Sequence, residues 1–240
     1  MQLLSRLLVF PAILLVVAVS PAPGASGPLP KDVITALEKG YGQLSDLQAD
    51  FSQYADMPSF HREDQSTGEL SIKKSGGSAM FRFNYRKPKQ QVISNGKTVW
   101  IYVPANKQVI TSDAASLFEG GNAIALSYLT GMGHLSTDFS ASTTGNGRDK
   151  KGNYLIDLIP RKNNPSISKL QLTVSAAAVD EFLASGKVNE PFPVISSTVY
   201  DQMGNRIRID FSKVRVNRGI GTDRFNFQVP PGVEVISPGK

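Results

Sequence analysis

Apolar residues recur at helical spacing near the start of the chain, over residues 30–44. Positions three and four apart share one face of a helix, so this spacing predicts an amphipathic helix. Pro30 lies at its start, where a missing N–H costs no hydrogen bond, and Gly42 weakens its end. The predicted buried face consists of Val33, Ile34, Leu37, Tyr41 and Leu44.

Most of the remaining chain alternates apolar and polar residues, as strands with one buried face do. The alternation is clearest in 47–53, 81–85 and 206–211. Turn-forming residues separate these runs, and Asn95-Gly96 is the strongest hairpin signal because a type I′ turn needs positive φ at both central positions. About ten or eleven strands joined by tight turns favour an antiparallel barrel or a strongly curved sheet over a βαβ fold.

Two stretches break the alternation. Residues 57–67 are polar and contain Pro58, so we expect a loop or a loose hairpin there. Residues 113–133 hold two short apolar segments bounded by glycines, each preceded by a residue that can cap a helix. Because these predicted helices interrupt an otherwise all-strand pattern, we expect them to act as a lid or plug.

Residues 98–103 (TVWIYV) form a predicted strand that is apolar on both faces. A half-buried strand should alternate, so either protein covers both faces or one face is kept apolar for a ligand. Trp100 and Ile101 point opposite ways, and alternation alone does not identify the face that would meet a ligand.

Residues 1–25 have the order of a secretory signal: Arg6 precedes a short apolar run, and small residues with prolines follow. The run is too short to span a bilayer. We expect residues 1–25 to be removed and residues 26–240 to form a single exported domain, with a retained membrane anchor as the alternative.

Composition and motifs argue against catalysis. The chain has no cysteine, which excludes thiol nucleophiles and thiolate metal sites. His61 and His134 lack a partner at metal-ligand spacing, and the chain has neither G-x-S-x-G nor an S-x-x-K followed by S-D-N. The formal charge of +6 is spread along the chain, which favours a solvated basic surface over nucleic-acid binding. We expect no catalytic residue, metal or cofactor.

The remaining signal is surplus apolar surface on Phe81, Phe83, Tyr85, Trp100 and Ile101, and in the glycine-bounded Leu117-Phe118 and Ile124–Leu129 segments. Ligand pockets are mostly apolar, and curved sheets readily enclose one. The alternative is that these residues only fill the core between sheet and helices.

Six blocks follow the N-terminal helix in a recognisable order: LQADFSQ (47–53), GELSIKK (68–74), FRFNYRKP (81–88), VISNGKTVWIYVP (92–104), VYDQMGNRIRIDF (199–211) and FNFQVPPGVEVI (225–236). In this order the chain resembles the LolA family, the periplasmic carriers of outer-membrane lipoproteins. The SNGKTVWIY block and the terminal F-x-F-x-x-P-x-G pattern are the most specific parts of the resemblance, whereas residues 113–195 match only in general character.

The resemblance implies a mainly β fold with a few helices: an unclosed antiparallel barrel of about eleven strands whose concave, apolar side is covered by helices. It also implies a function without catalysis, in which an apolar cavity shelters lipoprotein acyl chains across the periplasm. The implied partners are acylated lipoproteins, an inner-membrane lipoprotein-releasing transporter and an outer-membrane lipoprotein receptor. We expect a monomer.

The resemblance matches Phe81 and Phe83 to aromatic positions that face the cavity, and Tyr41 to an apolar position of the first helix. The family typically has an arginine and a proline where this chain has Lys74-Ser75. That arginine bonds backbone carbonyls of the lid, so Lys74 is the candidate lid latch, as a point donor without arginine's planar fork. The predicted lipid-binding residues are Tyr41, Phe81, Phe83, Tyr85, Trp100, Leu117, Phe118, Leu126 and Leu129.

Two other functions fit the same scaffold. One is a carrier or sensor for another envelope lipid or amphiphile. The other is an exported hydrolase that acts on lipid or glycan, which would require a nucleophile or paired carboxylates lining the cleft.

Overall fold

The computed structural model describes residues 27–75, 78–114, 133–164 and 166–237. The predicted signal sequence and the predicted lid residues Leu117, Phe118, Leu126 and Leu129 lie outside these ranges. The described strands are β1 (Asp46–Met57), β2 (Arg62–Ser75), β3 (Ser78–Lys87), β4 (Gln90–Ser94), β5 (Thr98–Val103), β6 (Gln108–Asp113), β7 (Phe139–Arg148), β8 (Tyr154–Pro160), β9 (Lys169–Val174), β10 (Val194–Tyr200), β11 (Arg206–Val216) and β12 (Glu234–Ile236). The described helices are α1 (Pro30–Gly42), α4 (Leu135–Asp138) and α5 (Ala176–Ser185), with 3-10 turns η1 (Pro58–Phe60), η2 (Pro104–Asn106) and η3 (Thr222–Phe225).

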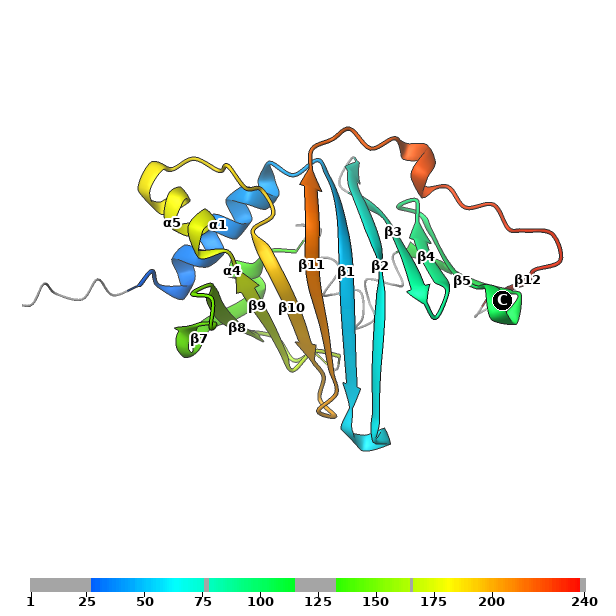
Figure 1. Cartoon of the computed structure of the whole chain (residues 1–240), viewed down its shortest axis with the longest axis horizontal. Coiled ribbons are helices and arrows are strands. Elements are labelled where there is room, and N and C mark those ends of the chain that lie inside the picture. Colours follow the sequence, from blue (N-terminus) through cyan, green and yellow to red (C-terminus); the bar gives the residue numbers. More distant parts are fainter. Residues whose placement is uncertain (1–26, 76–77, 115–132, 165, 238–240) are drawn as a thin grey trace, which may run out of the picture.

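The strands form one twelve-stranded sheet in the order β12-β6-β5-β4-β3-β2-β1-β11-β10-β9-β8-β7. β7 and β12 lie at opposite edges, so the sheet is not closed into a barrel (Figure 1). Neighbouring strands are antiparallel except β12, which pairs parallel to β6. The predicted mainly β, unclosed and largely antiparallel architecture is confirmed, with twelve strands and one parallel pair.

One face of the sheet, here called the inner face, carries the main core together with the helices. Figure 1 shows the helices gathered over the end of the sheet that contains β7 to β10. The predicted helix is confirmed as α1; Asp32 accepts a hydrogen bond from the backbone N–H of Leu29 at 3.0 Å and so closes its first turn. Gly40 permits a close approach, because a Cβ there would lie 2.8 Å from the carbonyl oxygen of Pro191. The face of α1 that packs on the sheet consists of Val33, Ile34, Ala36, Leu37, Gly40 and Tyr41.

The opposite face, here called the outer face, has its own apolar cover. After β11 the chain runs past β3 to β5 and returns to the sheet edge as β12 (Figure 1). Ring contacts of its Phe227 with Trp100 and Tyr102 place it on the outer side of these strands. Phe225 in this segment is fully buried and packs with Met80 of β3 and with Ile220. This crossing segment, residues 217–233, leads from β11 to the sheet edge, where β12 pairs parallel to β6.

Two local predictions need correction. Residues 57–67, expected to be a loop or a loose hairpin, form the end of a regular hairpin: residues 62–67 belong to β2, and η1 makes the turn from β1. This part of the hairpin extends past the core, so neither of its faces has to be apolar and the alternation that marks a strand is missing. The hairpin at Asn95-Gly96 is present, but only Gly96 has positive φ (88°), so its turn is not type I′.

Candidate functional site

Four aromatic rings form a continuous row on the inner face. Phe81, Phe83 and Tyr85 alternate along β3, with ring centroids 6.0 Å and 6.4 Å apart. Phe51 of β1 packs between them, at 5.7 Å from Phe83 and 5.1 Å from Tyr85 in edge-to-face geometry. We call Phe51, Phe81, Phe83 and Tyr85 the aromatic row. Edge-to-face pairs add stability beyond their buried area. Phe51, Phe81 and Phe83 are buried in the inner-face core, and Tyr85 continues the row as a partly buried ring.

Gly68 of β2 makes this row possible. It lies opposite both Phe51 and Tyr85 in the sheet. A Cβ at this position would lie 2.6 Å from Cζ of Phe51 and 2.4 Å from the carbonyl oxygen of Asn84. A glycine in a strand interior marks such a close approach. Here it leaves room for the Phe51 ring.

Part of the inner-face core is fully buried and part is open to solvent. Near α1, Tyr41, Phe192 and Phe211 are buried and contact one another through their rings. Other apolar side chains that adjoin the same core are only partly buried. On the strands they include Tyr85, Val92, Ile101, Val199 and Ile209, and on α5 they include Phe182. Partly exposed apolar side chains that continue a buried core are the surface on which an apolar ligand gains most from leaving water.

One polar pair lies at the open part of the aromatic row. The Tyr85 hydroxyl donates a hydrogen bond to Oε1 of Gln53 at 3.0 Å. Burial raises the pKa of Tyr85, so the phenol stays neutral and keeps its proton for this bond. The pair satisfies the Tyr85 hydroxyl without placing a charge on the inner face.

Lys74 of β2 bonds to α1. Its Nζ donates to the carbonyl oxygen of Tyr41 at 2.5 Å, near the C-terminal end of the helix, where a cation is favourable. Burial lowers the pKa of Lys74, because desolvation disfavours the ammonium form. Lys74 therefore fixes the end of α1 to the sheet. The predicted lid lies outside the described residues, so the latch role remains a prediction.

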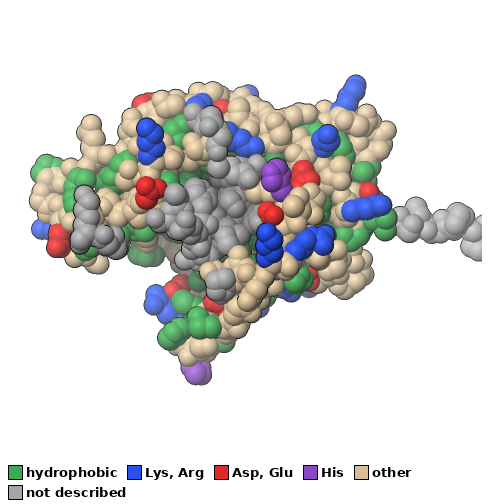
Figure 2. Space-filling view, turned by 180° about the vertical axis from the view of Figure 1, so that it is seen from behind, with side chains coloured by type: hydrophobic (Ala, Val, Ile, Leu, Met, Phe, Trp, Pro, Cys, Tyr) green, Lys and Arg blue, Asp and Glu red, His purple; other side chains and the backbone are tan. Residues whose placement is uncertain are grey.

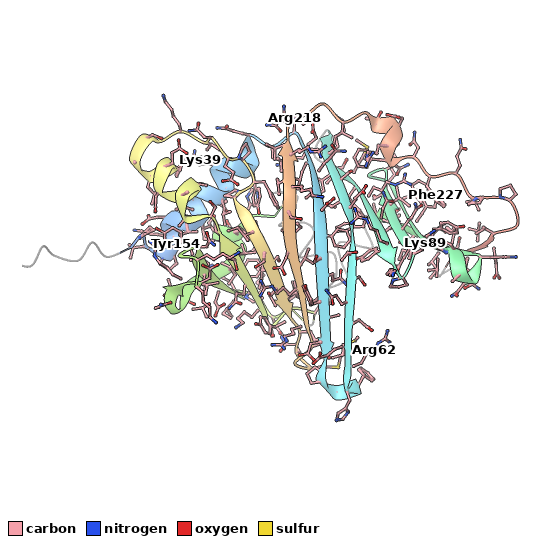
Figure 3. The ribbon with its side chains drawn as sticks, in the orientation of Figure 1. Lys39, Arg62, Lys89, Tyr154, Arg218 and Phe227 are labelled. Carbon is pink, nitrogen blue, oxygen red and sulfur yellow. The ribbon has the colours of Figure 1, made fainter. Side chains whose placement is uncertain are left out.

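Trp100 lies on the outer face. It pairs with Ile93, a position opposite Arg82, and therefore points away from the aromatic row. Its ring is 6.1 Å from Phe227 of the crossing segment, and Tyr102 is 5.6 Å from the same ring. Figure 3 labels Phe227. Val99 and Ile101 point to the inner face instead. The strand is apolar on both faces because protein covers each of them, at least in part.

The structure thus brings together Tyr41, Phe81, Phe83 and Tyr85 on one face, and separates Trp100 from them. Sequence reasoning did not select Phe51, Val92 or Ile209, which adjoin the same surface. Alternation in 47–53 and 206–211 already placed Phe51 and Ile209 on apolar strand faces. Only strand pairing could show that these are the same face as that of Phe83.

The two histidines lie apart from each other. His61 follows the β1–β2 turn and His134 precedes α4, so the two histidines are on different parts of the fold. Within the described ranges, no group of three or more His, Asp or Glu residues could hold a metal ion. No helix among the described residues is long and apolar enough to cross a membrane. Apolar side chains dominate the described inner face. Its polar groups include the Tyr85–Gln53 pair, Lys74, and the Tyr154 hydroxyl, which donates to Asp180.

Comparison with known proteins gives consistent matches. Residues 42–228 match the family described as outer membrane lipoprotein carrier protein LolA. The chain is 30% identical over 193 residues to an outer-membrane lipoprotein carrier protein of Pseudomonas aeruginosa, covering 79% of this chain and 80% of that protein. It is 27% identical over 217 residues to the protein of the same description from Chromobacterium violaceum, covering 90% and 93%. A solved LolA superfamily protein from Nitrosomonas europaea is 11% identical, with a TM-score of 0.39 and coverage of 84% and 99%.

Proposed function

Because this chain belongs to the LolA family of outer-membrane lipoprotein carrier proteins, we propose that it is a periplasmic carrier that holds lipoprotein acyl chains against the inner face of its sheet. The observation that carries the proposal is the aromatic row with its partly buried apolar surroundings. In this role the protein binds and releases its cargo without changing a covalent bond, as expected of a family of carriers.

The energetics of acyl burial support this role. Each methylene that leaves water contributes about 0.8 kcal/mol, so even part of one chain against the inner face would bind measurably. One side of the site is the aromatic row, and the predicted lid residues Leu117, Phe118, Leu126 and Leu129 would contact the chains from the other side. Release then requires only that the contacts on one side be lost.

The route proposed for the cargo is from the inner to the outer membrane. An inner-membrane lipoprotein-releasing transporter would load the carrier, and an outer-membrane lipoprotein receptor would unload it. The carrier would act as a monomer, after removal of residues 1–25 during export, with residues 26–240 as one domain. Because the receptor step needs no external energy source, the carrier must hold its cargo less tightly than the receptor does.

Two adjacent residues of β5 provide a matched test. Ile101 faces the inner side and Tyr102 the outer side, and both are partly buried. We expect Ile101→Glu to weaken binding of a diacylated lipopeptide at least tenfold, because it places a charge beside the acyl chains. Tyr102→Glu should leave the affinity within about twofold. Both affinities are measured by fluorescence titration, with circular dichroism to verify folding.

Equal binding by the two folded variants would contradict the assignment of acyl chains to the inner face. Mass spectrometry of lipid extracted from the purified native protein identifies the cargo class. Recovery of a non-lipoprotein amphiphile alone would replace the lipoprotein carrier with a carrier of that lipid.

A further inference from the structure

Two large apolar side chains stand out as the most exposed among the described residues. Phe60 is 69% exposed and Met203 is 67% exposed. Phe60 ends the turn between β1 and β2, and Met203 lies in the turn between β10 and β11. β1 pairs with β11 as far as Asp56 and Arg206, so the two turns lie beside each other at the same end of the sheet. We call Phe60 and Met203 the apolar tip.

The tip is held away from the body of the protein. β1 and β2 remain paired without interruption to Met57 and Arg62, through the polar residues 62–67. Figure 1 shows this hairpin as the longest projection of the sheet, and Figure 3 labels Arg62 near its end. In Figure 2, hydrophobic side chains gather near the end of the same projection. A polar, fully paired stem that carries an apolar end is suited to reach a surface that the core does not touch.

Several backbone N–H groups at the tip are bonded within their own turns. The N–H of His61 donates to the carbonyl of Pro58 at 3.1 Å. In the second turn, Oδ1 of Asp201 accepts from the N–H groups of Met203 and Asn205 at 2.8 and 2.9 Å. A turn whose N–H groups are already bonded enters apolar surroundings at lower cost. These N–H groups are also not available to pair with an added strand of a partner.

The arginines near the tip are paired with carboxylates. Arg62 lies 2.7 Å from Asp64, and Arg206 lies 2.8 Å from Asp56. Arg208, farther from the end, lies 2.7 Å from Asp210. The tip is therefore not a basic patch. Attraction to anionic head groups would be a minor contribution there, and contact has to depend on the apolar side chains.

We propose that the apolar tip inserts Phe60 and Met203 into the interfacial region of a lipid bilayer. Two side chains on a narrow projection offer far less area than the roughly 800 Å² per partner of a stable protein interface. A bilayer requires no complementary shape, and burial of a few exposed apolar side chains is sufficient for reversible contact. The inference is independent of what the inner face binds.

Fluorescence quenching tests this insertion directly. The chain has a single tryptophan, Trp100, so Trp100→Phe gives a silent background in which Phe60→Trp reports on the tip. With vesicles of phosphatidylcholine brominated on the acyl chains, we expect at least twofold quenching of the tryptophan emission of this double variant. The native chain, whose Trp100 lies against Phe227, should show little quenching. Absence of quenching at vesicle concentrations that saturate binding would overturn the proposal.

A second measurement separates insertion from general adsorption of a basic protein. We expect Phe60→Ser with Met203→Ser to reduce flotation with phosphatidylcholine vesicles at least fivefold. The control is Leu29→Ser with Val235→Ser, which replaces apolar residues that are 55% and 50% exposed elsewhere, and it should float like the native chain. Binding that needs anionic lipid and disappears at high salt, with equal loss in both double variants, would indicate electrostatic adsorption and contradict insertion.

The same double variant distinguishes this proposal from the carrier function. Phe60→Ser with Met203→Ser should bind a soluble acylated peptide as the native chain does, because neither residue adjoins the inner-face core. If the native chain binds vesicles but no acylated peptide, the tip proposal stands and the carrier proposal fails. The reverse result would overturn only the tip proposal.

Discussion

The position of the Phe51 ring in the candidate site depends on Gly68, which has no side chain to fill the same space. The Phe51 ring occupies the space directly over Gly68, and both strands belong to the centre of the sheet. Any Cβ at this position overlaps both the ring and the backbone of β3. The aromatic row therefore depends on glycine for its geometry as well as on four aromatic residues.

Gly68→Ala should destabilise the fold by about 1–3 kcal/mol, the range for overpacking a well-packed core. The matched control is Gly42→Ala at the end of α1, where a Cβ would meet nothing within 4 Å. That change should leave stability equal or slightly raised, because alanine favours a helix. Urea unfolding measures both. An unchanged midpoint for Gly68→Ala would mean that Phe51 and β3 can move apart without cost.

Residues 217–233 act as an element in their own right, although none of them belongs to a strand. They cover the outer face of β3 to β5 and pack against the apolar side chains there. Asp46 of β1 anchors the start of the crossing by accepting from the N–H groups of Arg218 and Gly219 at 2.8 and 2.9 Å. Without this segment, one side of β5 would expose Trp100 and Tyr102 to water.

Phe227→Ala should loosen this cover and make Trp100 a reporter. We expect a red shift of Trp100 emission and a loss of about 1–3 kcal/mol, because the ring is partly rather than fully buried. Acyl-peptide affinity should stay within about twofold, since the inner face is on the other side of the sheet. A large loss of affinity in a folded variant would show instead that the two faces are coupled.

At the scale of the whole molecule, two ionisable residues where α1 meets the sheet, Tyr41 and Lys74, make stability depend on pH. Tyr41 is 3% exposed, and burial raises the pKa of its phenol far above the usual value of about 10. Above about pH 10 the unfolded chain loses this proton while the folded chain keeps it, so stability falls as pH rises. Lys74 acts in the opposite direction: its lowered pKa means that the unfolded chain binds more protons, and stability rises with pH.

Comparison of Tyr41→Phe with the native chain isolates the tyrosine contribution. Between about pH 9 and about pH 11, the native chain should lose stability relative to Tyr41→Phe, by up to about 1.4 kcal/mol per pH unit above the unfolded pKa. Urea midpoints at several pH values measure this difference. Parallel pH profiles would show that Tyr41 ionises as readily in the folded chain as in the unfolded one.

Sequence and tertiary structure determine different parts of this protein. Local periodicity was sufficient to predict α1, most strands and the apolar faces of β1, β3 and β11, because helix and strand periods depend only on neighbouring residues. The order of motifs was sufficient to identify the family. The polar half of β2 was not predictable, because it lies beyond the core and carries no apolar face.

Which apolar face meets which surface was decided only by the tertiary structure. Trp100 and Ile101 are equally apolar in the sequence, yet Phe227, more than a hundred positions away, covers one, and the core adjoins the other. The same holds for Phe60 and Met203, whose turns lie at the same end of the sheet because β1 pairs with β11. Alternation predicts that two neighbouring strand residues point in opposite directions. Which of the two faces is covered depends on segments distant in the chain, and the local pattern contains no information about those segments.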